Sequence, residues 1–388
     1  GVLGNENIGE YMYMATMKRN NMTYSFGNNV VTGSAVSEFV NKNIAWEKKK
    51  STNIGIDLAM FNNRFEFTAE WYKNRSEDLL YGVPVPTQTG VANATVTMNA
   101  ASMDNSGFEF SATYRNHDHP FKYDVSANLS TLKNKVTSLG FGTKSYITGA
   151  YATYVGQEIG QFYGWVYEGI ARTQSDLENH ATQQGANLGD CLYKDISGPN
   201  GEPDGVIDAY DQTVLGSGLP KVNFGLSAHM EYKNFDLSIS TYGVLNYHVS
   251  DDIYNSLNSC YGWGNKDVAM ADANRFSADG STYLSSVPRT YAANKATLAW
   301  NDLFSSRKIQ NAAYWKIANV ELGYNFPDQW FRGLVSGVRV YVSAQNLYTF
   351  TGYKGYNVDY AGGTFTPGYN FCSFPSARSF MAGLHFTF

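Results

Sequence analysis

One acidic segment carries the residues best suited to chemistry. Residues 195–211 read DISGPNGEPDGVIDAYD, and the carboxylate spacing around a glycine matches the second half of a calcium-binding loop. Calcium takes about 6–8 oxygen ligands, which carboxylates and a backbone carbonyl can supply. We therefore predict a calcium site that stiffens a long loop, with ligands from Asp195, Asp204, Val206 (through its carbonyl), Asp208 and Asp211.

The segment also departs from the usual calcium pattern. Pro199–Pro203 lengthens its first half, and Asp211 stands where a longer Glu normally offers both carboxylate oxygens. An Asp- and Gly-rich surface turn that holds water is the alternative interpretation.

Signatures of catalysis are missing from the sequence. It contains no HExxH, GxSxG or Cys/His pairing, and its three cysteines lack metal-ligand spacing. Glu66, Glu70 and Glu109 recur on one face of predicted strands, but a polar barrel interior produces such neighbours without catalysis. We expect neither an enzyme nor an organic cofactor.

Aromatic side chains concentrate in two predicted loops, 251–308 and 348–373. Exposed rings stack on sugars or pack against a partner protein, so Trp263, Trp300 and Tyr356 are candidate substrate-binding residues. The alternative is that these rings pack on one another or form an aromatic girdle at a membrane surface.

The elements that must position these residues are amphipathic strands. Apolar and polar residues alternate at 338–345 and 379–388, and on both sides of turns near residues 62, 117 and 233. Aromatic residues reach 15%, charged residues only 16%, and the mean hydropathy is −0.34 with no long apolar run. This combination predicts an all-β protein, a transmembrane antiparallel β-barrel, with a soluble sandwich or propeller as the alternative. The net charge of −5 argues against a nucleic-acid partner.

Connection lengths give the barrel an orientation. Short turns lie near residues 62, 117, 233 and 330, whereas long excursions lie at 80–100, 136–219, 248–308 and 348–373. Bacterial barrels place short turns in the periplasm and long loops outside. Alternation then gives roughly 9–10 crossings and assigns Gly156–Ile170 to an outer excursion. For Tyr11–Gly27 a hairpin and an ordered loop both stay open.

The first residues, GVLGNENIGE, include no initiator Met and no signal peptide. Because an outer-membrane protein needs a signal sequence, we expect residues 1–388 to be the later part of a longer chain.

Several blocks, in order along the chain, resemble the C-terminal half of SusC/RagA-type TonB-dependent transporters. They include GVLGNENIG (1–9), DNSGFEF (104–110), VGQEIGQFYGWVYEGI (155–170), DGVIDAYDQTVLGSGLPK (204–221) and WKIANVELGYNFP (315–327). The closing blocks are VRVYVSAQNLYTFTGYKGYNVD (338–359) and FPSARSFMAGLHFTF (374–388).

The resemblance implies a barrel of about 22 strands in the outer membrane of a Gram-negative bacterium. It implies an N-terminal plug domain, absent from these residues, on which TonB acts, and a SusD-like surface lipoprotein as partner. The expected function is import of an oligomeric glycan or peptide. A passive porin-like channel and an outer-membrane adhesin or receptor are the alternatives.

Overall fold

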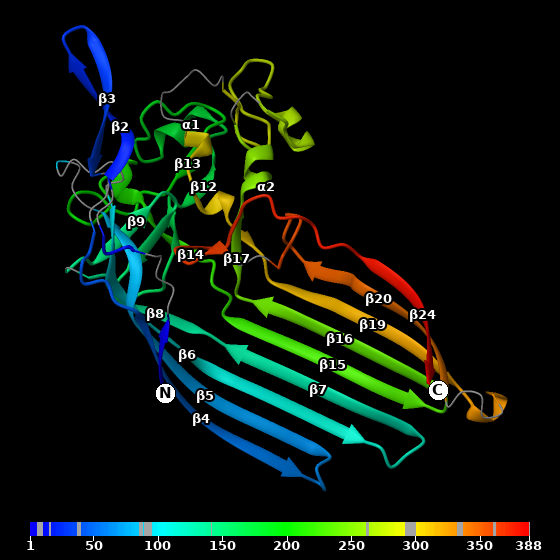
Figure 1. Ribbon diagram of the computed structural model, residues 1–388. Coiled ribbons are helices and arrows are strands. Elements are labelled where there is room, and N and C mark those ends of the chain that lie inside the picture. Colours follow the sequence, from blue (N-terminus) through cyan, green and yellow to red (C-terminus); the bar gives the residue numbers. More distant parts are fainter. Residues whose placement is uncertain are drawn as a thin grey trace.

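The computed structural model describes residues 1–5, 11–14, 17–36, 40–84, 88, 95–140, 142–260, 264–291, 300–331, 337–359 and 362–387. Its main element is one antiparallel sheet in which each long strand pairs with the next long strand along the chain (Figure 1). In spatial order the strands are β1 (Val2–Asn5), β4 (Glu47–Met60), β5 (Phe65–Pro84), β6 (Thr95–Asn116), β7 (Phe121–Thr131), β15 (Val222–Tyr232), β16 (Phe235–Leu245), β19 (Tyr314–Phe326), β20 (Gly337–Thr351) and β24 (Ser379–Thr387), and β8 (Lys133–Ser138) also pairs with β6.

The register separates apolar from polar side chains across the whole sheet. One cross-strand row is aliphatic or aromatic at every position: Met60, Phe65, Tyr114, Val125, Ala228, Ile239, Val320, Ala344 and Phe380. The adjacent row, on the other face, is polar after its first member: Ala59, Glu66, Thr113, Ser126, Ser227, Ser240, Asn319, Gln345 and Ser379. One apolar face and one polar face are the pattern expected of the wall of a lipid-embedded barrel.

Aromatic residues mark both ends of the apolar face. Phe235, Tyr324 and Phe326 cluster at one end, and Trp315 stacks on Phe350 at the other. Tyr324 and Trp315 lie on the same strand, so their separation is about 30 Å along the strand. With a tilt of about 40° this becomes roughly 24 Å, close to the apolar band of outer-membrane barrels. The two clusters therefore have the spacing of interfacial girdles.

Short turns lie at one end of the sheet and long connections at the other (Figure 1). The β4–β5 turn uses left-handed backbone at Phe61, Asn62 and Asn63, and the β15–β16 turn uses it at Lys233. Asparagine tolerates this conformation because its short side chain bonds the local backbone. These turns stand where the sequence predicts them.

The connection between β7 and β15 folds into small sheets away from the wall. One contains β9 (Ser145–Thr148), β10 (Tyr151–Tyr154), β11 (Gln161–Gly164) and β14 (Thr213–Ser217), and the other pairs β12 (Tyr167–Ile170) with β13 (Cys191–Tyr193). The helix α1 (Gln174–Glu178) starts with a capping box at Thr173. The helical turn Ala209–Asp211 precedes β14.

The β16–β19 connection holds β17 (His248–Asp251), α2 (Asp252–Leu257) and β18 (Gln310–Asn311), and the β20–β24 connection holds β21 (Gly362–Gly363), β22 (Thr366–Pro367) and β23 (Tyr369–Asn370). β17 pairs with both β18 and β23. Further helical turns span Val268–Asp272, Trp300–Asp302, Ser306–Lys308 and Asp328–Phe331. None of the helices in the described ranges is long and apolar enough to cross a bilayer.

The sequence predicts most of this arrangement. Nine long strands and the short β1 confirm the expected 9–10 crossings, and β11 and β12 confirm that 156–170 lies off the wall. β2 (Met17–Phe26) and β3 (Asn29–Val36) form a separate hairpin, so the 11–27 segment does not join the wall. The expected excursion at 80–100 is wrong in extent, because β5 and β6 stay paired as far as Pro84 and Thr95.

Candidate functional site

Ion pairs connect neighbouring strands on the polar face of the wall. Arg115 lies 2.7 Å from Glu66, and Lys122 lies 3.9 Å from Glu231. Glu70 and Glu109 are direct cross-strand partners and line a hollow of about 550 Å³. The three carboxylates predicted to share a face do share it, as they would on the wall of a polar lumen.

A second ion-pair group joins three strands near the short-turn end. Arg339 on β20 contacts Asp236 on β16 and lies 2.8 Å from Glu321 on β19. Asn325 also donates to Asp236 at 2.9 Å. Gly323 lies beneath this group, and a Cβ there would approach both Arg339 and Asp236 to 2.5 Å. A larger residue at this position would displace the charged group that crosses the strand.

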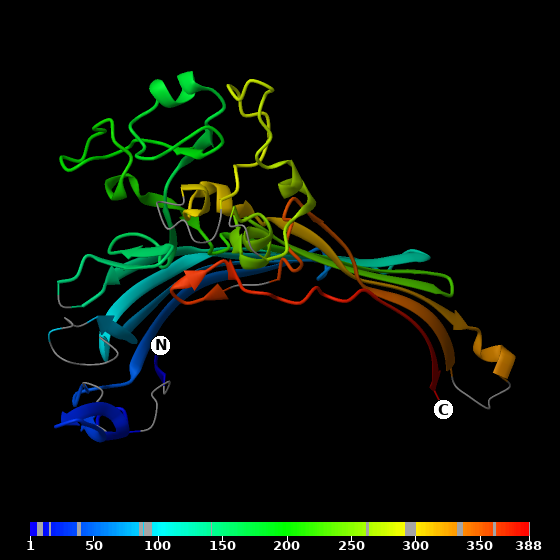
Figure 2. The same cartoon turned by 90° about the horizontal axis from the view of Figure 1, so that it is seen from above.

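A long connection, the strap, crosses the concave side of the sheet. We define the strap as residues 352–378, and Figure 2 shows its short strands under the arch formed by the wall. It packs on the polar face, since Asp359 pairs with the buried Lys316 of β19 and accepts from the hydroxyl of Tyr242 on β16. The concave side is therefore the polar, lumenal side.

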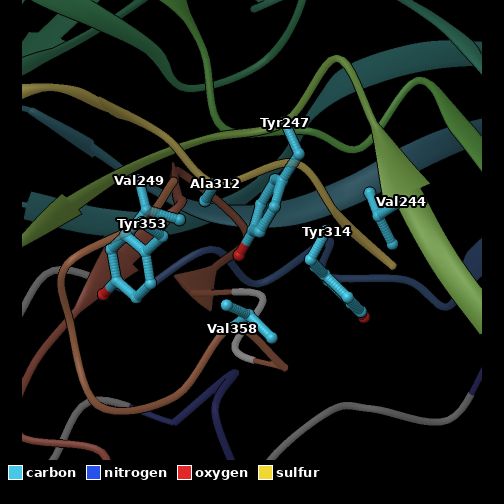
Figure 3. Packing of buried hydrophobic residues seen from close by; sticks show 7 residues of the cluster. All are labelled: Val244, Tyr247, Val249, Ala312, Tyr314, Tyr353 and Val358. Atoms are coloured by element: carbon cyan, nitrogen blue, oxygen red, sulfur yellow. The ribbon is translucent and has the colours of Figure 1, made fainter. Parts of the chain in front are cut away.

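An apolar cluster holds the near end of the strap against the wall. Val244, Tyr247, Val249, Ala312, Tyr314, Tyr353 and Val358 pack together, as Figure 3 shows. The cluster combines residues from the ends of β16 and β19, from β17 and from the strap. Burying these side chains stabilises a loop that would otherwise be free to leave the lumen.

One buried carboxylate ties three segments of the strap region together. Asp251 accepts from the hydroxyl of Tyr353, from the Asn370 amide at 3.0 Å and from the Tyr254 backbone N–H at 2.7 Å. Burial, with the hydrogen bond to Asp251, raises the pKa of the Tyr353 hydroxyl. The hydroxyl therefore stays protonated and keeps donating at neutral pH.

The far end of the strap reaches strands on the opposite part of the wall. Phe365 packs against Tyr81 of β5 and against Tyr146, with ring centroids 5.7 and 5.6 Å away. Gly160 and Gly218 let the strap approach closely, because a Cβ at either would lie within 2.5 Å of Pro367. The strap thus spans the lumenal face from β20 to β5.

The two longest excursions form one cap above the wall. Arg289 forms a two-pronged ion pair with the buried Asp190, and Asn301 also donates to Asp190 at 2.8 Å. Tyr193 donates its hydroxyl to the Trp300 carbonyl, and the Trp300 indole donates to Gln184 at 3.0 Å. Segments about a hundred residues apart are thereby fixed to each other.

The three predicted substrate-binding aromatics lie in different settings. Trp300 is 6% exposed and belongs to the cap's core, so its ring packs inside the cap as the alternative interpretation proposes. Tyr356 is 60% exposed and lies on the strap beside a cavity. Trp263 lies outside the described residues. The lumenal cluster around Lys316 and Asp251 carried no sequence signal, because its members come from separate elements.

The acidic segment uses its carboxylates to order its own backbone. Asp211 is fully buried and accepts from the N–H groups of Ile196, Ser197 and Asp208 at 2.8, 3.2 and 2.8 Å. Asp208 accepts from Tyr210 at 2.7 Å.

The other carboxylates of this segment are engaged more loosely. Asp195 accepts from Gly205 at 2.7 Å through one oxygen, while its other oxygen is buried without a partner, and Asp204 accepts from Val206 at 3.0 Å. Within the described ranges no three His, Cys, Asp or Glu side chains gather as a metal would require. Calcium binding stays a prediction.

Two thiols in the cap are buried rather than reactive. Burial raises the pKa of Cys191 and of Cys260 to about 12, so both remain protonated at neutral pH. Both side chains belong to the packed interior of the cap.

Comparisons with known proteins agree with this architecture. Residues 10–347 match the family model described as TonB dependent receptor-like, beta-barrel. The chain is 30% identical to TonB-dependent receptor P3 of Formosa agariphila and 27% identical to TonB-dependent receptor SusC of Bacteroides thetaiotaomicron, covering all of this chain and 38% and 37% of those proteins. It superimposes on a structure of the RagAB peptide transporter with a TM-score of 0.79 at 23% identity, covering all of this chain and 40% of that one.

The chain thus spans about two fifths of the length of the relatives it matches. The family consists of receptors of the Gram-negative outer membrane rather than enzymes, which confirms those two expectations. The alternating rows, girdle spacing and sequential strand order of this chain are those of a barrel wall in lipid. The chain belongs to the TonB-dependent receptor-like β-barrel family.

Proposed function

We propose that this chain forms part of the wall, cap and lumenal strap of a TonB-dependent importer for an oligomeric glycan or peptide. The observation that carries the proposal is the strap, which is fixed across a polar lumen by Lys316–Asp359, by Asp251 and by Phe365. A fixed strap narrows the lumen and supplies polar and aromatic contacts, which suits selective binding before transport.

TonB supplies the energy in this proposal by acting on a plug domain encoded outside these residues. A SusD-like surface lipoprotein covers the cap and captures the substrate. Similarity to a structure of the RagAB peptide transporter supports the choice of partner, and similarity to a receptor named SusC supports the same class.

Uptake of labelled oligosaccharides and peptides in intact cells tests the proposal. We compare cells carrying the full-length receptor with the same cells depleted of TonB and with cells lacking the neighbouring lipoprotein gene. Transport that disappears in both strains, together with co-purification of the lipoprotein on a tagged receptor, supports a TonB-dependent importer.

The alternatives give different results in the same cells. A passive channel transports equally well without TonB. An adhesin or receptor binds its ligand at the surface but delivers none to the periplasm. Either outcome overturns the proposal.

A further inference from the structure

A cavity of about 390 Å³ lies between the inner face of β20 and the strap. Much of its lining is polar, with side chains from Lys316, Asn346, Thr349, Tyr356, Asn357 and Arg378. No acidic side chain is among the described residues that line it. The cavity is therefore a hydrogen-bonding pocket with positive charge on its rim.

The two cations of the pocket differ in their surroundings. Lys316 is 3% exposed, and its charge is matched by Asp359, which faces a neighbouring hollow rather than this one. Arg378 is exposed, and none of the ion pairs of the described residues engages its guanidinium. Arg378 therefore leaves the pocket with one uncompensated positive charge.

The floor of the pocket is built by an irregularity in the wall. The pairing of β19 with β20 shifts after Ile317, so Asn346 and Leu347 together oppose Ala318, and Asn346 adopts a left-handed backbone with φ of 51°. Such a bulge re-aims a side chain. Asn346 uses its amide to donate to the Ala377 carbonyl at 2.9 Å, which fixes the segment that carries Arg378 over the strand.

We propose that this pocket is a substrate subsite for a carboxylate, with Arg378 as its anion-binding residue. A guanidinium binds a carboxylate through two parallel hydrogen bonds, and the surrounding amides and hydroxyls match a polar ligand. Tyr356 offers an exposed ring beside the charge for the rest of the ligand to stack on. The carboxylate belongs either to an acidic sugar or to a peptide. This inference rests on the proposed import function and narrows its substrate.

Binding to the purified full-length receptor tests the subsite with defined probes. These are a galacturonic acid trisaccharide with its methyl ester, and an Asp-terminated pentapeptide with its C-terminal amide and Asn analogue. We expect one of the two acidic probes to bind, and its neutral analogue to bind at least tenfold more weakly. Arg378→Gln should weaken binding of the acidic probe by at least about tenfold, because the two charge-assisted hydrogen bonds of the guanidinium are lost.

Lys354→Gln is the matched control. It removes another exposed cation from the same strap. Lys354 lies over the ring of Tyr254 and outside the cavity, so the substitution should leave the affinity for the acidic probe unchanged. Both variants should keep the unboiled gel mobility of the folded barrel.

The subsite is refuted if Arg378→Gln binds the acidic probes as tightly as the wild type, if neutral analogues bind equally well, or if neither acidic probe binds. Measuring TonB-dependent uptake in the Arg378→Gln strain separates this failure from that of the import function. Uptake that still depends on TonB but is unchanged in Arg378→Gln would support the import function and refute the subsite.

Discussion

Individual carboxylates of the acidic segment have different tasks. Asp211 is buried with three backbone N–H donors, whereas Asp195 keeps one buried oxygen without a partner. The first arrangement needs no metal, and the second is where a cation would find a free ligand. Substitutions at the two kinds of position therefore distinguish a hydrogen-bonded turn from a calcium site.

We predict that calcium slows proteolysis of the 195–211 segment in the full-length receptor and that a chelator reverses the effect. Asp195→Asn should abolish the response to calcium, because it removes the carboxylate that carries the free oxygen. Asp211→Asn should destabilise the segment by at least about 1 kcal/mol with or without calcium, because it weakens hydrogen bonds to buried N–H groups. Equal cleavage rates of the wild type in calcium and in chelator would exclude a calcium site in this loop.

His248 makes the docking of the strap sensitive to pH. It stands on β17, which pairs with β23 of the strap, and burial lowers the pKa of its imidazole, with the nearby Lys221 acting in the same direction and a backbone hydrogen bond to Ser217 opposing it. A lowered pKa means that the undocked state binds the proton more readily than the docked state. Stability is therefore complete above about pH 6.5 and falls as the pH drops from there toward the lowered pKa.

We predict that hydrogen exchange of residues 366–370 accelerates between about pH 6.5 and 5 after correction for the intrinsic rate. His248→Gln removes the titrating group and should flatten this dependence. His229→Gln, on the wall where the histidine bonds Ser238, is the control and should keep it. If hydrogen exchange of residues 366–370 in His248→Gln keeps the pH dependence of the wild type, a group other than His248 causes it.

At the scale of elements, the ion-pair group around Arg339 fixes the register of three strands. Asp236→Asn leaves Arg339 with a weaker partner next to Glu321, in a part of the wall where Asp236 is buried. We predict a loss of about 2–3 kcal/mol, since breaking the buried pair from one side leaves Arg339 with Glu321 as its only counter-charge among these residues. The temperature at which the unboiled barrel loses its fast gel mobility should fall accordingly.

The double variant Asp236→Asn with Arg339→Gln is the matched test. Removing both charges should recover part of the lost stability, because the buried charge at Asp236 and its partner are lost together, while Glu321, which also loses Arg339, is 27% exposed to solvent. A loss of stability in the double variant that exceeds the sum of the losses in the two single variants would contradict a direct pairing of these residues.

Strands were predictable from sequence and the strap was not, for a physical reason. The face of Phe65 or Phe380 follows from a period of two residues, which is local information. The position of the strap depends on contacts between residues far apart in the sequence. Lys316 and Asp359 are 43 positions apart, and Phe365 and Tyr81 are 284 positions apart. Nothing in the local pattern around Asp359 or Phe365 encodes those partners, so aromatic loops could be named as candidates but not placed.

The same limit explains the extent of β5 and β6. Their register shifts between Ser76 and Leu80, which breaks strict alternation, and the pairing is regular again from Leu80 to Pro84. Tyr81, Ala101 and Val136 pack there into a cluster with Leu139 and Ile159. Tertiary burial thus extends the hairpin past the point where periodicity ends.

At the scale of the whole molecule, the wall has two open edges. Among the described residues β24 pairs only with β20, and β1 pairs only with β4. Strand edges in lipid leave N–H and C=O groups without partners, at a cost of several kcal/mol for each group, so spanning sheets close on themselves. The wall therefore needs further strands to close, and the chain spans only about two fifths of the length of the relatives it matches.

We predict that the full-length receptor, refolded in detergent, runs as a compact, fast-migrating species until it is boiled. Residues 1–388 refolded alone should show no such species, and should aggregate through the edges formed by β24 and β1–β4. Adding the preceding part of the receptor in the same refolding mixture should restore the compact species, because it provides the missing partners for both edges. A compact, heat-sensitive species from residues 1–388 alone would mean that these strands close into a small barrel. The porin-like channel would then be the better account of the molecule.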